Sequence, residues 1–269
     1  MPADEGMKTG HRPPGPQWQL MQSIKVTEMQ VADGITKACF TLQYNMSSQM
    51  ATLPSLTDEP TLYPGCCFSL SRPLLATIRA LLESIPILTP PDVKPSNSSS
   101  EHASVLLSIG SGTGLLEELL QRYLESSEAR DSSHHSSSST WRVEGVEVNP
   151  AVNVYLPEDR INHVVGTWAV LGSRARDATA LMFVYPRDGS LVRRYIDRTS
   201  MTMGPTSRTT CGGVQAVLWL GPKCDWEDTG LGSFTTRDEY EIFEMRSSTG
   251  LAGYEMLAVL RRKTIASLA

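Results

Sequence analysis

The stretch from Val105 to Gly114 constrains the fold of this chain more than any other part of the sequence. It reads Val-Leu-Leu-Ser-Ile-Gly-Ser-Gly-Thr-Gly and is followed by an apolar run from Leu115 to Leu124. The apolar residues before Gly110 predict a strand that is covered on both faces, and the following run predicts a helix. A strand, a glycine turn and a helix start bring backbone N–H groups and the positive end of a helix dipole to one point. The stretch therefore predicts an α/β domain with a nucleotide site at this turn.

The spacing of the glycines distinguishes between kinds of nucleotide-binding loop. The dinucleotide fingerprint Gly-x-Gly-x-x-Gly, counted from Gly110, requires a glycine where this chain has Leu115. The spacing found, together with its strand, resembles motif I of the class I S-adenosylmethionine (SAM) dependent methyltransferases. The resemblance implies a Rossmann-like, doubly wound, mostly parallel sheet and SAM as cofactor. It also implies that a loop of Gly110, Ser111, Gly112 and Gly114 passes under the methionine and ribose portions of SAM.

The resemblance predicts an acidic residue at the end of the second strand, where a carboxylate accepts hydrogen bonds from the ribose hydroxyls. Glu147 in the stretch Gly-Val-Glu-Val-Asn-Pro fits this role, with Asn149 beside it as a second polar contact. Glu147 follows Gly114 by 33 residues, more than the roughly 20 of such units. A Ser/His-rich run of 15 residues, 126–140, is predicted to be a surface insertion, and without it the spacing is 18.

One position departs from the family pattern. Members of the family commonly carry Asp or Glu two residues before the first glycine, and this chain has Ser108. A hydroxyl cannot give the charge-assisted pairing that a carboxylate gives to an ammonium group. The sequence therefore predicts weakened binding of the methionine amine.

The rest of the chain predicts the remaining elements of such a sheet. Apolar stretches predict strands and their exit loops over 162–168, 180–186 and 214–220, a helix over 191–196, and a closing antiparallel hairpin of 239–245 with 254–260. We therefore predict a SAM-binding domain over 101–269.

The residues before this domain are predicted to form an extension to it. Residues 1–16 contain too few apolar side chains to pack and predict a disordered tail. Residues 17–100 predict a largely helical cap that ends in a Pro/Ser-rich linker, with one helix over 70–85. By resemblance, the segment 63–68 is expected to border the site.

Further site residues are expected where strands end, because ligands of open α/β sheets gather there. Thr167 stands where the family commonly has an acid near the adenine amine, and Trp168 is expected to wall the adenine. Tyr185 and Asp225 are the candidate catalytic residues, as acid/base or orienting groups. The residues predicted to contact the substrate are Arg187 and Trp226.

Composition limits the partners that we expect. The net charge is −5, which disfavours nucleic acid or an anionic membrane as a partner. The chain has five cysteines without metal-ligand spacing, so no residue is assigned to a metal. No apolar run approaches the length of a membrane span, and we expect a soluble, cytoplasmic protein.

These observations favour a SAM-dependent methyltransferase that acts on a small molecule, with the methylated atom open. Three alternatives remain. The first is a catalytically degenerate methyltransferase fold kept as a binding or scaffold protein, which Ser108 and Thr167 favour. The second is a nicotinamide-dependent oxidoreductase, which Leu115 disfavours, and the third is aminopropyl transfer from decarboxylated SAM, which requires a more acidic site.

Overall fold

The computed structural model describes residues 51–86, 103–126, 140–200, 213–229, 231, 240–248 and 250–263. These residues belong to one compact unit that spans Ser48–Ala269. The predicted tail, 1–16, and the greater part of the predicted linker and of the Ser/His-rich insertion lie outside the described residues.

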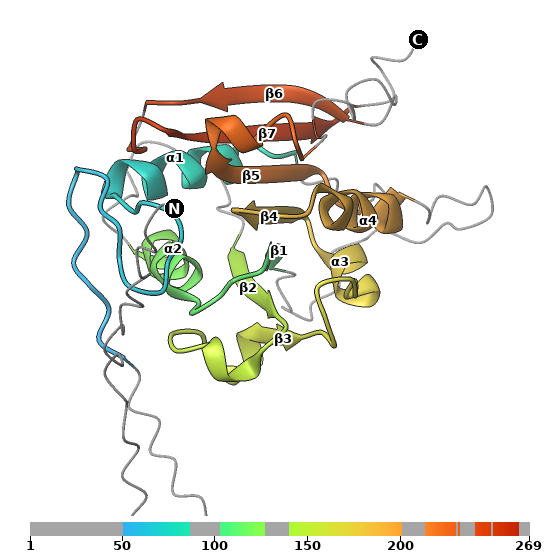
Figure 1. The fold of residues 1–269 in the computed structure, drawn as a ribbon, viewed down its shortest axis with the longest axis horizontal. Coiled ribbons are helices and arrows are strands. Elements are labelled where there is room, and N and C mark those ends of the chain that lie inside the picture. The colour runs from blue at the N-terminus through green and yellow to red at the C-terminus, as the bar shows by residue number, and fades with distance from the viewer. Residues whose placement is uncertain are drawn as a thin grey trace, which may run out of the picture. The chain divides into compact units, whose positions relative to one another are not determined.

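One mixed sheet of seven strands organises the described residues (Figure 1). The strands stand in the order β3-β2-β1-β4-β5-β7-β6, and only β7 runs antiparallel to its neighbours. Their bounds are β1 Ser104–Ile109, β2 Trp141–Glu147, β3 Ile161–His163, β4 Ala180–Val184, β5 Ala216–Pro222, β6 Tyr240–Arg246 and β7 Glu255–Arg262. The chain order reverses between β1 and β4, and such a switch point is where ligands bind in open α/β sheets. The predicted doubly wound, mostly parallel sheet with an antiparallel closing hairpin is thus confirmed.

Helices cover both faces of the sheet. In Figure 1, α1 (Arg72–Glu83) and α2 (Leu115–Glu125) lie on one face, and α3 (Gly172–Asp177) and α4 (Gly189–Ser200) lie on the other. Alternate residues of β1 serve the two layers: Leu106 packs with α1 and α2, whereas Leu107 packs with α3 and α4. Ser108 follows the same alternation and faces α2.

The observed strands are close to the predicted ones, with one exception. A third strand with its exit loop was expected over 162–168, but β3 is an edge strand that pairs with β2 only from Ile161 to His163. Beyond it, Val164 donates one last hydrogen bond to the Glu147 carbonyl, and Val165 is 86% exposed. The exit loop of the third strand therefore begins earlier than the apolar residues suggest.

The predicted helix over 70–85 is observed as α1. Ser71 caps it by accepting a hydrogen bond from the Leu74 N–H at 3.2 Å, and Pro73 fits in the first turn, where no intrahelical donor is needed. Its apolar stripe, with Leu74 and Ile78 fully buried, packs on the sheet face that also carries α2. The capped helix fixes the segment before it against the sheet.

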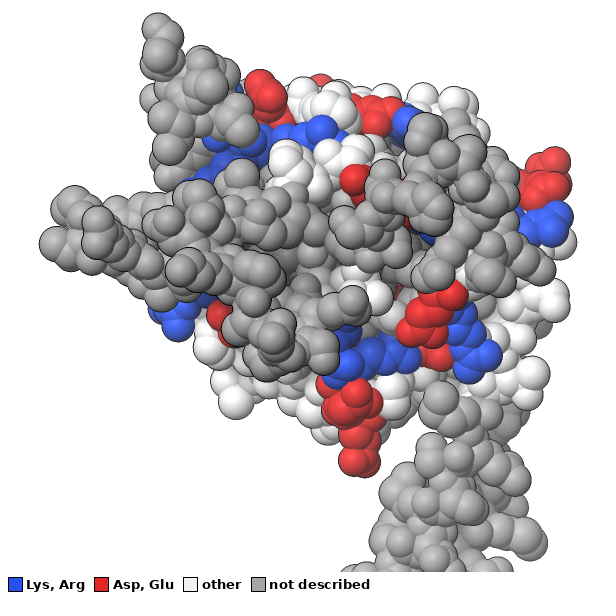
Figure 2. Space-filling view, turned by 180° about the vertical axis from the view of Figure 1, so that it is seen from behind, with Lys and Arg blue, Asp and Glu red and all other residues white. Residues whose placement is uncertain are grey.

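Charged side chains of the described residues alternate in sign over the surface. Figure 2 shows blue and red side chains lying next to one another on one face of the molecule. Several form ion pairs, such as Arg142 with Asp159 at 2.9 Å. In the part of the chain that the structure describes, no helix has the length and apolar character needed to cross a membrane.

Candidate functional site

The glycine loop joins β1 to α2 at the switch point of the sheet. Gly110, Gly112 and Gly114 all have positive φ, of 78°, 56° and 78°. A side chain at Gly114 would collide with Leu156 at 2.7 Å, so this glycine serves packing. At Gly112 an added Cβ would meet only the Gly65 carbonyl, at 3.8 Å, and would otherwise point into open space. A ligand can therefore approach the backbone at Gly112.

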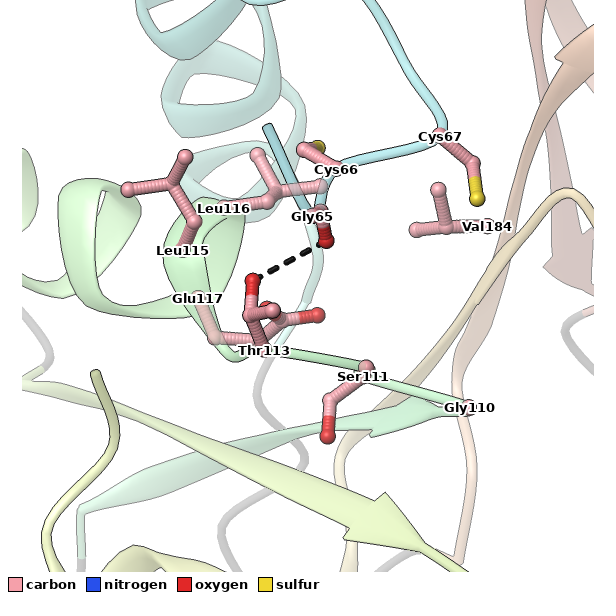
Figure 3. Close-up of a pocket in the computed structure, with 11 residues that line it drawn as sticks. Gly65, Cys66, Cys67, Gly110, Ser111, Thr113, Leu115, Leu116, Glu117 and Val184 are labelled. Atoms are coloured by element: carbon pink, nitrogen blue, oxygen red, sulfur yellow. Dashed lines mark hydrogen bonds between the residues drawn. The ribbon is translucent and has the colours of Figure 1, made fainter. Parts of the chain in front are cut away.

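Two backbone hydrogen bonds fix the glycine loop to the end of β2. The N–H groups of Gly110 and Ser111 both donate to the Val146 carbonyl, at 2.9 and 3.2 Å. The Ser111 hydroxyl points away from the hollow above the loop (Figure 3), and an added Cβ at Gly145 would meet it at 2.5 Å. Of the predicted cofactor residues, Ser111 therefore presents backbone and not its hydroxyl to a ligand.

Glu147 lies where the sequence places the ribose-binding carboxylate, and it contacts the glycine loop directly. Its Oε2 accepts a hydrogen bond from the Gly112 N–H at 2.9 Å, and its Oε1 accepts one from the Val148 N–H at 2.8 Å. The side chain of Asn149 is exposed and accepts from the Ala151 N–H at 3.1 Å, which caps a short 3-10 helix, η2 (Pro150–Val152). The carboxylate is thus oriented by backbone donors beside the loop, with lone pairs left for ligand hydroxyls.

A small hollow, open to solvent, lies between the glycine loop and the segment before α1 (Figure 3). The Thr113 hydroxyl donates to the Gly65 carbonyl at 3.0 Å and links the two walls. Gly65, Cys66 and Cys67, from the segment 63–68 that was expected to border the site, line this hollow. The Cys66 thiol donates to the Phe68 carbonyl, and burial raises its pKa to about 12, so it is no nucleophile at neutral pH.

One acidic residue that lines this hollow was not predicted from the sequence. Glu117, in the first turn of α2, is only 1% exposed, and its Oε1 accepts a hydrogen bond from the Ser108 hydroxyl at 2.5 Å. Burial raises the pKa of Glu117 to about 7, and nearby Glu147 adds to the effect. The signal in the sequence is an acidic pair, Glu117 and Glu118, inside the apolar run of the predicted helix.

The residues predicted for the adenine end are exposed at the far side of β2. Trp168 is 69% exposed, and its ring lies so close over Gly166 that an added Cβ there would meet it at 2.4 Å. Thr167 is also exposed, and Val165 adds a second exposed apolar side chain in the same loop. The loop after β3 therefore offers an apolar surface to a flat ring.

Tyr185 follows β4 and has a positive φ of 49°, which is uncommon for a residue other than glycine. Its hydroxyl donates to Glu255 Oε1 at 3.1 Å, and its ring meets Phe68 edge-on with centroids 5.9 Å apart. Burial, and then the charge of Glu255, raise the pKa of Tyr185 above its usual value. The hydroxyl is thus a hydrogen-bond donor at neutral pH and no proton acceptor.

Neither Tyr185 nor any other predicted substrate or catalytic residue lines the hollow. Arg187 is exposed in the loop after β4, and Asp225 is exposed at the end of a 3-10 helix, η4 (Lys223–Asp225). Trp226 is partly buried and packs edge-on against the core residue Trp219, with ring centroids 5.2 Å apart. Arg187 follows the carboxyl end of β4, and Asp225 and Trp226 follow that of β5.

Comparison with known proteins gives likeness in fold. No family model matches the chain, and no curated protein matches it. Among solved structures, it is similar to the human methyltransferase 10 domain containing protein, with 14% identity over 72% of this chain and 83% of that chain and a TM-score of 0.41. A Streptococcus thermophilus rRNA methylase shares 10% identity over 72% of this chain and 99% of that chain, with a TM-score of 0.40. TrmK of M. capricolum, solved with S-adenosylhomocysteine, shares 8% identity over 61% and 64% of the two chains, with a TM-score of 0.39.

The comparison corrects two expectations, a small-molecule acceptor and the absence of a nucleic-acid partner. Four of the similar structures are described as enzymes that methylate tRNA, rRNA or protein. One other similar structure, a mitomycin 7-O-methyltransferase, acts on a small molecule. The net charge on which the expectation rested describes the whole chain and says nothing about one face of it.

Proposed function

We propose that this chain binds SAM at the glycine loop and transfers its methyl group to an acceptor. The observation that carries the proposal is the 2.9 Å hydrogen bond from the Gly112 N–H to Glu147 Oε2. It joins an acidic residue at the end of β2 to a loop of positive-φ glycines at the switch point of the sheet. This is the arrangement that a ligand with a ribose and a flexible polar tail requires.

The proposed contacts divide SAM into three parts. The backbone of Gly110, Ser111, Gly112 and Gly114 lies under the methionine and ribose portions. Glu147 accepts hydrogen bonds from the ribose hydroxyls, with Asn149 at the rim. Trp168 gives the adenine an apolar wall, and Thr167 a polar contact.

SAM supplies a methyl group on a positively charged sulfur, so the protein has mainly to orient the acceptor and exclude water. Tyr185 fits an orienting role, because burial and then Glu255 keep its hydroxyl protonated beside the segment that lines the hollow. Asp225 stays the candidate to accept a proton. We place Arg187 and Trp226 at the acceptor side of the site, where the carboxyl ends of β4 and β5 lie.

Calorimetry with S-adenosylhomocysteine and with NAD tests the cofactor. We expect the protein to bind S-adenosylhomocysteine and not NAD, because the third glycine of the dinucleotide fingerprint is replaced by Leu115. The Glu147→Gln variant should bind S-adenosylhomocysteine about tenfold or more weakly, since a neutral amide replaces a charged acceptor. Binding of NAD alone would overturn the proposal.

Transfer is tested with SAM that carries a labelled methyl group. The purified protein is incubated with a cell extract, and the label is followed into the RNA and protein fractions. Label in either fraction above that of a Glu147→Gln control supports the proposal. Binding of S-adenosylhomocysteine without transfer would favour the catalytically degenerate alternative. A cytoplasmic location stays a prediction from the sequence.

A further inference from the structure

Two adjacent acidic residues of α2 are both buried, but they have different surroundings. Glu118, 4% exposed, is paired with Arg122 and Arg160. Glu117, 1% exposed, has one side-chain hydrogen-bond partner among the described residues, the Ser108 hydroxyl. Its second oxygen, Oε2, is buried and accepts no hydrogen bond from the described part of the chain. An unpaired buried carboxylate is costly, so Glu117 differs from an ordinary acidic residue of a helix.

The Glu117 carboxyl group lies on the wall of the hollow above the glycine loop. Figure 3 shows it among the lining residues, beside Thr113. Glu147 is close enough to act on its titration. Two carboxyl groups thus flank the glycine loop, Glu147 from β2 and Glu117 from α2.

The position of Glu117 relative to Ser108 explains why residue 108 is not acidic. Ser108 faces α2, and its hydroxyl donates to Glu117 Oε1 at 2.5 Å. An acid at position 108 would therefore project into the region that the Glu117 carboxyl group occupies. The chain carries its negative charge at this place on the helix instead of on the strand.

A charge buried in this way is suited to a cation that arrives with the ligand. Among the described residues no Lys or Arg forms an ion pair with Glu117, and no group of three or more His, Cys, Asp or Glu side chains is arranged to hold a metal ion. A single carboxylate with one free oxygen suits an ammonium group, which donates hydrogen bonds and needs no ligand cage.

We infer that Glu117 receives the ammonium group of the methionine portion of SAM, in place of the acid that is absent at position 108. The inference rests on the proposed function and assigns to this chain a cofactor contact that its glycine motif lacks. The weakened binding of the methionine amine that Ser108 predicts is then offset by α2. Burial favours the neutral form of Glu117 in the empty site, and an ammonium group beside it favours the ionised form.

The test compares two ligands and three proteins by calorimetry at pH 7.5. The ligands are S-adenosylhomocysteine and its analogue in which hydrogen replaces the amino group. The proteins are the full chain, Glu117→Gln and the matched control Glu118→Gln, which alters the neighbouring buried acid but leaves the hollow unchanged. Both variants keep the size of the side chain, and thermal melting establishes that each is folded.

We expect Glu117→Gln to weaken S-adenosylhomocysteine by about ten- to a hundredfold, the range of a charge-assisted hydrogen bond. The analogue without the amino group should bind the full chain and Glu117→Gln equally, because it has no cation to lose. Glu118→Gln should bind both ligands as the full chain does. These results together support the inference.

Two results would overturn it, and they differ from a failure of the proposed function. Equal affinity of the full chain and Glu117→Gln for S-adenosylhomocysteine would show that Glu117 is not the acceptor. An equal loss for both ligands would show that Glu117 only shapes the loop. If neither ligand binds the full chain, the SAM site itself is wrong and the inference falls with it.

Discussion

Gly112 controls how closely a ligand can approach the loop backbone. An added side chain would point into the hollow, where the nearest described atom is the Gly65 carbonyl at 3.8 Å. We therefore expect Gly112→Val to abolish the heat of S-adenosylhomocysteine binding. The φ of 56° strains any residue with a Cβ, so urea unfolding should also show a loss of about 1–2 kcal/mol.

Gly253→Val is the matched control for this change. Gly253 is exposed, has no atom within 4 Å of an added Cβ and lies outside the hollow. The same substitution there should alter stability by no more than about 0.5 kcal/mol and leave binding intact. A Gly112→Val protein that binds like the full chain would place the ligand elsewhere.

Glu117 makes the stability of the empty protein depend on pH. Its folded pKa of about 7 lies above the usual 4.5, so the folded state favours the neutral carboxyl. The resulting stabilisation is fully present below about pH 4.5 and is lost as the pH rises through 7. The difference amounts to up to about 3 kcal/mol above pH 7.

The Glu117→Gln variant removes this dependence, because glutamine stays neutral. Its melting temperature should therefore exceed that of the full chain by more at pH 8 than at pH 5. The groups that face Glu117, namely Ser108, Cys66 and Glu147, are common to both proteins, so the difference isolates the one carboxyl. An equal difference at both pH values would contradict the burial of a titrating Glu117.

The sequence predicts some residues of the site and leaves others out for a physical reason. The glycines follow from one strand–loop–helix unit, and Glu147 follows from the spacing to the end of the next strand, β2. Glu117 cannot be predicted in this way, because its role depends on which face of α2 packs against the sheet and on the contact of its side chain with Ser108 of β1. Glu118 has the same residue type one position later and forms only ion pairs.

At the scale of elements, α1 supports the wall of the hollow that segment 63–68 forms. Leu74 is fully buried in the layer between α1, α2 and the sheet. We expect Leu74→Ala to lower the free energy of unfolding by about 2–5 kcal/mol, since it leaves a cavity. Leu62→Ala is the control, because Leu62 is 58% exposed, and it should cost no more than about 0.5 kcal/mol. Equal losses in urea unfolding would contradict the packing of α1.

Helices and strands with a strong hydrophobic period could be predicted from the sequence, and the length of the edge strand β3 could not. The stripe of α1 reflects burial of one helix face, and the apolar runs of β1, β4 and β5 reflect burial on both sides of the sheet; the sequence displays both patterns. The length of β3 is set by how far β2 continues beside it, and the apolar Val164 and Val165 give no sign of that limit.

For the molecule as a whole, Glu255 joins three parts that are distant in sequence. This carboxylate at the start of β7 is fully buried and accepts hydrogen bonds from the Ser69 N–H at 3.0 Å and from the Tyr185 hydroxyl at 3.1 Å. The antiparallel strand, the loop after β4 and the segment before α1 meet there. The apolar pattern predicts β7 but not this junction. The role of Glu255 depends on hydrogen-bond donors that are far away in the sequence, and the sequence does not show which residues these are.

Tyr185→Phe tests this junction, with Tyr63→Phe as the matched control. The first change leaves a buried carboxylate without one donor, so we expect urea unfolding to show a loss of about 1–3 kcal/mol. The Tyr63 hydroxyl makes only a long bond of 3.4 Å, open to solvent, to the Ser55 carbonyl, and its removal should cost less than about 0.5 kcal/mol. If both variants were equally stable, the hydrogen bond to Glu255 would contribute nothing. The positive φ of Tyr185 would then have to be held by the hydrogen bond from its N–H to the Leu220 carbonyl and by the packing of its ring against Phe68.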